Sequence, residues 1–444
     1  MIWSIGVLTT VLGAVAFNSA VDPYGMMGAL RIDGFNKEKP RLVNNIRLAK
    51  AYGVRRYAPR SVVLGTSRVE VGIAPDDPAW PAADRPVYNL GLSGGTIYEA
   101  LRYLEHAQSS TTLRTAIVGL DLEAFLTADD TMPGFSELRL AVDVEGRPRT
   151  LAERAVQFGR DLVLTNATME AAWASVETVV RNVIHSRDLR YRADGSRDMS
   201  DVAAGTLRAG GYRVQFSPPG LIERARARLA SGCRETVMDS RELFSNQMVR
   251  GISAFQQLLK FAKREGIALK LFISPLHAWK LQVYDGMGLW PTFEDWKRVL
   301  VRTVADVYPD ASDKRPIIVD FSGYSRFATE PVPLPGDART EMRWYWDPNH
   351  FRRSIGALIL SRLFAENASE NHPDDGFGTA ITLKNVDAHI AAIRAAKANY
   401  ERQRPFDAYS ALLEGLIQRA TNCAKIADAV TKLEYARVNL SATR

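Results

Sequence analysis

Three residues far apart in the sequence carry the side chains of nucleophilic acyl chemistry. Ser67 ends the segment VVLGTS, in which an apolar run meets a turn of small residues. Asp347 and His350 lie three positions apart in the segment DPNH, just before an expected helix. A serine hydroxyl can attack a carbonyl carbon when a histidine accepts its proton and a carboxylate orients the imidazole. We therefore predict a catalytic triad with Ser67 as nucleophile, His350 as general base and Asp347 as the orienting acid.

Each of these residues also has an ordinary structural interpretation. Ser67 could be a helix N-cap, because small hydroxyl side chains are common there, and the segment GTSR alone favours that interpretation. His350 could be a hydrogen-bonded structural histidine, and Asp347 could cap the helix expected near Phe351. The order of the motifs along the chain, and their expected places in the fold, favour catalysis.

A glycine-rich loop could complete the site. The segment NLGLSGGT covers residues 89–96 and contains the pair Gly94-Gly95. A backbone N–H at Gly94, together with that of Ser67, could stabilise an oxyanion, which requires a close approach that a side chain would obstruct. The pair could equally form a plain tight turn.

The elements that must position these residues alternate between strands and helices. Short apolar runs predict buried strands, and spacings of three and four residues predict helices. The expected strands are 61–64, 87–90, 115–120, 268–273 and 316–321; the expected helices are 41–52 (ending at Gly53), 97–107, 247–265, 293–307 and 351–364. This alternation predicts an α/β fold with a parallel sheet.

Polar loops follow several of the expected strands. In parallel α/β sheets, ligands bind beyond the carboxyl ends of the strands. Ser67, the 91–96 loop, Asp121–Glu123 and Ser274–His277 all fall at such ends, and Asp347–His350 could reach the same edge. We expect these five loops to converge on one site.

The sequence divides into five predicted parts. Residues 22–126 and 246–366 carry the α/β pattern, and residues 127–245 interrupt it as a mostly helical insertion or lid, with a helix expected at 169–184. Residues 367–444 form a helical C-terminal extension. Residues 1–21 contain a wholly uncharged, mostly apolar stretch of about the length that spans a bilayer, which predicts a membrane anchor.

The N-terminal stretch has two alternatives. It could be a signal peptide cleaved near Ala14-Val15-Ala16, although a basic segment before the apolar stretch is missing, or it could be a buried core helix. The first positive charges, beginning at Arg31, follow the stretch, so the positive-inside rule favours a cytoplasmic body.

Composition narrows the function classes. The 444 residues carry a formal net charge of +7, which suits an anionic partner or simply a mildly basic surface. The basic residues are dispersed and no nucleic-acid-binding signature is present, so we expect no nucleic-acid partner. The two cysteines, Cys233 and Cys423, have no metal-ligand spacing, and we expect no metal and no cofactor. Nucleotide binding ranks last, because LGLSGGT lacks both the P-loop lysine and the GxGxxG spacing.

Three blocks of this sequence resemble the SGNH (GDSL-like) hydrolase superfamily. They are GTSR around Ser67, the glycine block with Gly94 at the oxyanion position, and the block from Asp347 to His350. The anchor followed by VDPYG, the GTSR serine and the segment SPLHAW resemble the membrane-anchored SGNH-like proteins of bacterial polysaccharide O-acetylation, relatives of alginate O-acetyltransferase accessory proteins.

This resemblance covers scattered blocks between about residues 21 and 364, and it carries several expectations. It implies a flavodoxin-like three-layer α/β/α fold, held at the inner membrane by a single N-terminal helix with the body in the periplasm. It implies a serine-dependent O-acyl (acetyl) transferase or esterase that acts on a polysaccharide. A membrane-bound O-acyltransferase partner would supply the acyl group.

Two departures from the family pattern bear on function. The third family block provides an oxyanion Asn, but here the strand is followed by Asp121-Leu122-Glu123, and a carboxylate cannot donate. This departure motivates the alternative of a non-catalytic scaffold or polysaccharide-binding subunit. Arg68 could bind an acidic sugar or form a salt bridge to Asp121 or Glu123. Asn89 and His277 are further substrate-binding candidates, with a structural role as the alternative for His277.

Overall fold

The centre of the molecule is a sheet of six strands in the order β10-β7-β6-β3-β1-β2. The computed structural model describes residues 2–127, 129–184, 190–200, 205–207, 211–212, 240–286, 289–309, 315–334, 336–365 and 377–403. Five strands are parallel, and β10 pairs antiparallel with β7 at one edge. The strands are β1 (Ser61–Leu64), β2 (Val87–Asn89), β3 (Thr115–Leu120), β6 (Ala268–Ile273), β7 (Ile318–Asp320) and β10 (Thr379–Ile381).

Successive strand residues point into two separate cores. In β1, Val62 and Leu64 belong to one buried cluster, and Val63 between them belongs to the other. The parallel strands consist of continuous apolar runs because both faces of the sheet are covered. The mixed α/β fold with a mostly parallel sheet is therefore confirmed, and it is compatible with three layers.

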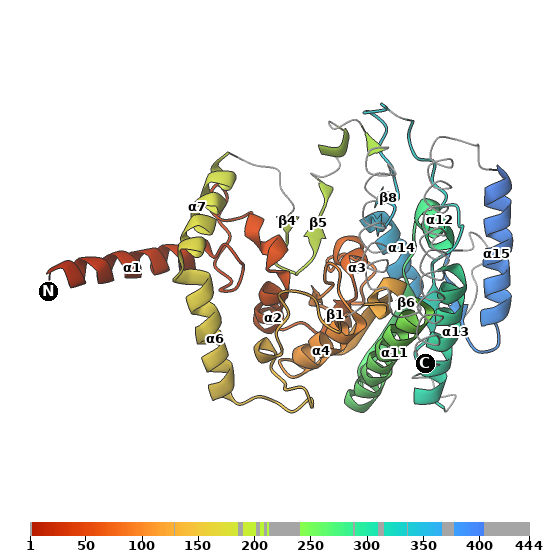
Figure 1. The fold of residues 1–444 in the computed structure, drawn as a ribbon, viewed down its shortest axis with the longest axis horizontal. Coiled ribbons are helices and arrows are strands. Elements are labelled where there is room, and N and C mark those ends of the chain that lie inside the picture. The colour runs from red at the N-terminus through yellow and green to blue at the C-terminus, as the bar shows by residue number, and fades with distance from the viewer. Residues whose placement is uncertain are drawn as a thin grey trace, which may run out of the picture.

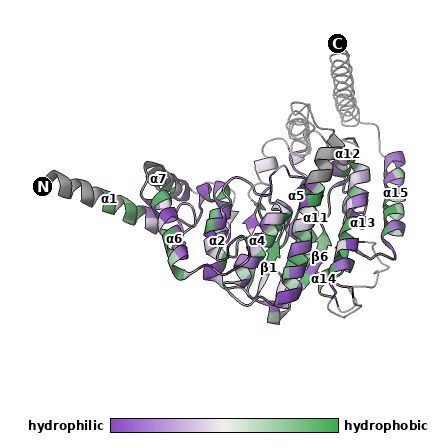
Figure 2. Cartoon of the chain, turned by 60° about the horizontal axis from the view of Figure 1, so that its bottom comes forward, coloured by the Kyte–Doolittle hydropathy of each residue, from purple (hydrophilic) through white to green (hydrophobic). Residues whose placement is uncertain are grey.

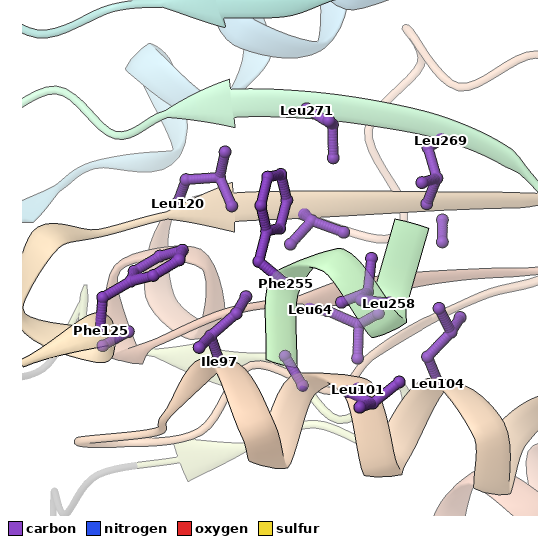
Figure 3. Packing of buried hydrophobic residues seen from close by; sticks show 14 of the residues in the cluster. Leu64, Ile97, Leu101, Leu104, Leu120, Phe125, Phe255, Leu258, Leu269 and Leu271 are labelled. Carbon is purple, nitrogen blue, oxygen red and sulfur yellow. The ribbon is translucent and has the colours of Figure 1, made fainter. Parts of the chain in front are cut away.

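Helices cover both faces of this sheet. Figure 3 shows the larger core, in which Leu101 of α4 and Leu258 of α11 pack over Leu64 and its neighbours. Val69 of α3 and Ile355 of α14 belong to the core on the opposite face. The first face carries α2 (Ile46–Tyr57), α4 (Ile97–Gln108), α11 (Ser240–Glu265), α13 (Trp290–Val307) and α15 (Val386–Gln403); the second carries α3 (Ser67–Gly72) and α14 (Arg353–Leu363). Helix α12 (Ala278–Gly286) contributes residues to both cores.

The predicted insertion occupies two places. Helices α6 and α7 lie at the end of the body from which α1 leaves, opposite α15 (Figure 1). The β4–β5 hairpin instead lies beside α3, close to the site described below. The remaining elements are α1 (Ile2–Val21), η1 (Pro40–Asn44), η2 (Ala82–Asp84), α5 (Leu122–Phe125), η3 (Glu137–Arg139), α6 (Leu151–Asn166), α7 (Met169–Val183), β4 (Arg190–Tyr191), β5 (Arg197–Asp198), β8 (Tyr345–Asp347) and β9 (His350–Phe351).

The first helix of the body differs from its prediction. α2 runs from Ile46 to Tyr57, so Gly53 lies inside the helix and does not cap it. A Cβ atom at Gly53 would lie 2.3 Å from the Tyr88 hydroxyl, which shows that the glycine permits close packing. The actual C-cap is Ala58, with a left-handed backbone at φ 48°. From the sequence alone, a glycine that permits close packing against another segment cannot be distinguished from a glycine that caps a helix.

Several predicted features remain predictions. Within the residues that the structure describes, no helix has both the length and the apolar character needed to cross a bilayer. The membrane anchor is therefore a prediction, as are the five domain boundaries. Cys233, Cys423 and the C-terminal extension beyond residue 403 lie outside the described residues.

Candidate functional site

The turn after β1 places Ser67 at the start of a helix without using its hydroxyl as the helix cap. Gly65 has a φ of +137°, and a Cβ atom there would lie 2.7 Å from the Gly119 carbonyl oxygen, so a side chain does not fit. Thr66 is the N-cap of α3, and its hydroxyl oxygen accepts the Arg68 N–H at 3.3 Å. Thr66 thus performs the capping that Ser67 could have performed, and Ser67 is the first residue of α3.

The structure brings the three predicted triad residues into one hydrogen-bond chain. Ser67 Oγ lies 2.8 Å from His350 Nε2, and His350 Nδ1 lies 2.7 Å from Asp347 Oδ2. Because a carboxylate only accepts, the proton of the neutral ring belongs on Nδ1, which leaves Nε2 free to accept from the serine. This is the arrangement that a nucleophile and its base require.

A short two-stranded turn holds Asp347 and His350 together. β8 and β9 pair antiparallel, and Asp347 pairs with His350 in their register. Asp347 Oδ1 accepts the backbone N–H groups of Asn349 at 2.7 Å and His350 at 3.0 Å. Burial alone would raise the pKa of Asp347, but His350 and these N–H groups lower it to about 2. The acid is therefore ionised throughout the neutral range.

The glycine loop lies directly against the nucleophile turn. The Leu92 N–H donates to the Gly65 carbonyl oxygen at 2.9 Å, and Leu92 also bridges to Thr66. Gly94 has a φ of +64°, and a Cβ atom there would meet only the Met132 side chain at 3.7 Å. In the described part of the chain, the N–H groups of Ser67 and Gly94 have no hydrogen-bond partner. An oxyanion hole requires such unpaired N–H groups.

Arg68 is buried and bridges the two halves of the site. Its two terminal nitrogens bind both oxygens of Glu123 at 3.0 and 3.1 Å, and its Nη1 lies 2.9 Å from Asp121 Oδ1. Its Nε donates to the Asn349 carbonyl oxygen at 3.2 Å, inside the turn that carries the acid and the histidine. The salt-bridge alternative for Arg68 therefore describes its contacts, and its buried guanidinium holds α3 against that turn.

The charges around Arg68 balance one another. Burial alone would raise the pKa of Glu123, but Arg68 and Lys280 hold it well below its usual range. Lys280 Nζ lies 3.4 Å from Glu123 Oε1. For Arg68 both effects on the pKa are reversed. Burial alone would lower its pKa, while Asp121 and Glu123 raise it well above the usual value. Two cations thus face two carboxylates.

Replacing Arg68 should lower the free energy of unfolding. Arg68→Met leaves the Asp121 and Glu123 carboxylates buried without the guanidinium, which typically costs about 3–5 kcal/mol of unfolding free energy. Urea unfolding would measure this loss. Arg147→Met is the matched control, because Arg147 pairs with two carboxylates but is exposed, and its midpoint should stay close to that of the parent chain. Equal midpoints for both variants would contradict a structural role for Arg68.

Asn89 is placed inside the fold and away from any substrate role. Its side chain is fully buried, and its amide nitrogen donates to the carbonyl oxygens of Val69 at 2.8 Å and Ile73 at 2.9 Å. Its amide oxygen accepts the Gly91 N–H at 2.9 Å. Asn89 therefore fastens α3 and the glycine loop to β2, and its donors and acceptor are occupied.

His277 also has a structural placement, because it supports the triad turn from behind. Its backbone N–H donates to the Pro348 carbonyl oxygen at 3.2 Å, and its ring is 1% exposed. Nε2 lies 2.9 Å from the Glu330 carbonyl oxygen and Nδ1 lies 3.2 Å from the Trp279 N–H, so the ring donates at Nε2 and accepts at Nδ1. Both nitrogens are occupied, so the ring has neither a proton nor a lone pair to offer a substrate.

The buried His277 should make the protein sensitive to acid. Burial lowers the pKa of His277 from its ordinary value of 6.5 to about 4. Between those values the unfolded chain binds a proton that the folded chain does not, so stability falls as the pH falls from 6.5 to 4. When the pH falls from 7.5 to 5, the unfolding free energy of the parent chain should drop by about 2 kcal/mol more than that of His277→Gln. Urea titrations at both pH values would test this, and equal pH slopes would contradict it.

A buried charged network below the glycine loop is absent from the sequence predictions. Lys50 Nζ lies 3.0 Å from Glu70 Oε1 and also binds the Gly91 carbonyl oxygen. The Ser93 hydroxyl donates to Glu70 Oε2 at 2.9 Å, and Arg197 of the β4–β5 hairpin lies 3.9 Å from the same oxygen. Lys50 and Glu70 lie among apolar residues in their own segments, but nothing in either segment indicates that the two side chains meet.

Comparisons with known proteins assign no function to this chain, so its function is argued from the geometry of the site. No protein-family model matches the chain, and a search of curated proteins finds no significant match.

Proposed function

We propose that this protein is a serine-dependent O-acyl transferase or esterase. The observation that carries the proposal is the continuous hydrogen-bond chain from Ser67 through His350 to Asp347. The three residues come from the end of β1 and from the β8–β9 turn, 283 positions apart for Ser67 and His350. Such a chain lets a serine lose its proton as it attacks a carbonyl carbon.

The chemistry follows from the positions of the protons. Ser67 Oγ attacks the ester carbonyl, its proton moves to His350 Nε2, and the imidazolium formed is stabilised by the ionised Asp347. The N–H groups of Ser67 and Gly94 would stabilise the oxyanion. His350 then gives the proton to the departing alcohol, which leaves an acyl group on Ser67. Attack by water releases a carboxylic acid, whereas attack by a sugar hydroxyl transfers the acyl group.

The family proposal rests on several features together. The parallel strands occur in the order β2-β1-β3-β6-β7, which is the flavodoxin-like order 2-1-3-4-5. Ser67 and Asp121 follow β1 and β3, the two strands at the switch point where such sheets bind ligands. These features, with the three sequence blocks, support an SGNH-like fold.

The substrate and the location are extended from the resemblance. We assign the acyl group as acetyl and the acceptor as an envelope or extracellular polysaccharide. The body would face the periplasm from the inner membrane, with α1 as its attachment. A membrane-bound O-acyltransferase would supply the acyl group. A cleaved signal peptide would instead release the body from the membrane.

A specific observation favours the alternative of a non-catalytic scaffold or polysaccharide-binding subunit. Asp121 stands where the family has its oxyanion asparagine, and its Oδ2 accepts the Thr66 hydroxyl at 2.5 Å. Its Oδ1 lies 2.9 Å from Arg68 Nη1, and a carboxylate in such an ion pair accepts hydrogen bonds and does not donate them. A missing oxyanion donor typically costs about 10²–10³ in rate, so the enzyme proposal itself implies slow turnover unless a partner supplies the donor.

The proposal is tested by measuring whether the acetyl group of an ester is transferred to a polysaccharide or released as acetate. The full chain would be incubated with p-nitrophenyl acetate and a deacetylated polysaccharide, one acidic polymer and one neutral polymer in separate reactions. An enzyme should release p-nitrophenol in a burst and place acetyl esters on the polymer or release acetate. Saccharide binding without a burst would support the scaffold instead.

A further inference from the structure

Helices α6 and α7 have the reverse of the usual amphipathic pattern. The α7 residues that face the body are small or polar: Ala171, Ala174, Ser175, Thr178 and Asn182. Its large apolar side chains are exposed instead: Met169, Trp173, Val176, Val180 and Val183. A helix on a water-exposed surface normally buries its apolar stripe, so this helix is suited to an apolar environment on its outer side.

The same reversal continues into α6. Its fully buried residues are Asp161, Thr165 and Asn166, and Phe158 and Leu162 pack half-buried against the body, whereas Leu151, Val156, Val163 and Leu164 are exposed. Exposures of 86% for Met169 and 67% for Trp173 show that these are not partly covered edges. Figure 2 shows hydrophobic, green residues along both helices. Exposed apolar side chains grouped in this way mark an interaction surface. We call the outward faces of α6 and α7 the apolar arm.

Besides the packing of Phe158 and Leu162, polar contacts on its inner side fasten the arm to the body. Asp161 binds the Tyr52 hydroxyl at 2.7 Å and Arg139 at 3.0 Å. Asn182 accepts the Glu38 N–H at 2.9 Å and donates to the Glu38 carbonyl oxygen at 2.8 Å. These contacts hold the arm in one orientation with its apolar side outward.

The position of α1 indicates what the arm contacts. The end of α1 is hydrogen-bonded to the corner between α6 and α7: Asn18 donates to the Asn166 carbonyl oxygen at 2.9 Å, and Asn166 donates to the Ser19 hydroxyl at 2.6 Å. From that corner α1 extends away from the body, while α6 and α7 run across its direction (Figure 1). No charged residue occurs in Ile2–Val21, and Val11, Leu12 and Phe17 are exposed on it.

We infer that the apolar arm lies on the surface of a lipid bilayer, with α1 directed into it. Exposed apolar side chains at the base of an uncharged projecting helix are typical of an interfacial anchor, in which apolar side chains enter the acyl boundary. Trp173 suits this boundary, because its ring is apolar while its N–H remains polar. A lipid surface explains the exposed side chains better than a groove on a partner protein. A partner that approached the corner between α6 and α7 would meet the projecting α1 (Figure 1). The contact needs no membrane-spanning helix.

Quenching of a fluorophore on the arm by a lipid-borne quencher tests the contact. In the full chain with Cys233 and Cys423 replaced by Ser, an environment-sensitive fluorophore would be attached through Val176→Cys in the arm. Ala395→Cys is the matched control, because Ala395 is exposed on α15 at the opposite end of the body (Figure 1). Vesicles of phosphatidylcholine and phosphatidylglycerol would carry a doxyl quencher near the headgroup. We expect quenching of the probe in the arm and none of the control probe.

Charge substitutions in the arm give a second readout, compared in chains that all carry the same α1. Trp173→Glu combined with Val180→Glu replaces exposed side chains and should fold normally, while the fluorophore in the arm loses most of its quenching. In vesicle flotation the double variant should bind about tenfold more weakly or worse. Val299→Glu combined with Leu383→Glu is the control, since both residues are exposed apolar side chains outside the arm.

Three outcomes would overturn the inference. The chain could fail to float with vesicles, or float while the probe in the arm stays unquenched. The probe could also be shielded in native membranes but not in lipid vesicles, which would place a protein partner on the arm. None of these outcomes depends on esterase activity, so they leave the proposed function to its own test.

Discussion

Ser67→Ala should abolish ester turnover and covalent labelling while leaving the fold intact. The hydroxyl is the only part of Ser67 in the hydrogen-bond chain to His350, and Thr66, not Ser67, caps α3. Removing the nucleophile of a triad typically costs about 10⁶ in kcat. Intact-mass analysis after reaction with a fluorophosphonate should show one added probe on the parent chain and none on Ser67→Ala. Hydrolysis of p-nitrophenyl acetate should fall to the background rate.

A matched serine separates this effect from general damage. Ser109→Ala removes an exposed hydroxyl that binds only the His106 carbonyl oxygen of its own helix, at 3.0 Å. It should keep both the label and the turnover. Full activity in Ser67→Ala would exclude the mechanism. Absence of labelling in the parent chain would favour the scaffold, or a site that a membrane partner must complete, and co-purification with that partner would then be the next step.

The parallel strands are predictable from sequence because each depends on a local pattern. A strand buried on both faces is a continuous apolar run, and 61–64, 115–120 and 268–273 match the structure residue for residue. β10 lacks that signal, since it has only three residues and lies antiparallel at an edge of the sheet. The β4–β5 hairpin has two residues in each strand and lies in a polar stretch, so it is equally invisible to such patterns.

The site is predictable only in part for a related reason. Ser67, Asp347 and His350 are recognisable because each occupies a short motif with its own turn chemistry. The role of a polar residue outside such a motif depends on which residues of other segments contact it in the folded protein. Arg68 becomes a positioning residue because Glu123 follows β3 and Asn349 lies in the triad turn. Buried polar residues are typically satisfied in this way, and burial is a tertiary property.

Asp347→Asn should separate the role of the acid in catalysis from its role in the turn. Asn keeps an oxygen that can accept the N–H groups of Asn349 and His350, as Asp347 Oδ1 does. Its amide nitrogen would replace Oδ2 beside His350 Nδ1, and an amide N–H requires Nδ1 to accept. The ring proton then moves to Nε2, where it blocks proton transfer from Ser67.

The expected loss for Asp347→Asn is therefore about 10⁴ in kcat with little change in KM, since the tautomer is wrong while the binding surface is retained. Steady-state hydrolysis of p-nitrophenyl acetate would measure it, with the midpoint of thermal unfolding as a check on the fold. The control is Asp143→Asn, because Asp143 accepts backbone N–H groups in an exposed turn and pairs with Arg147 outside the site. It should retain full activity. A loss of kcat below tenfold in Asp347→Asn would show that Asp347 only shapes the turn and that His350 finds its tautomer by other means.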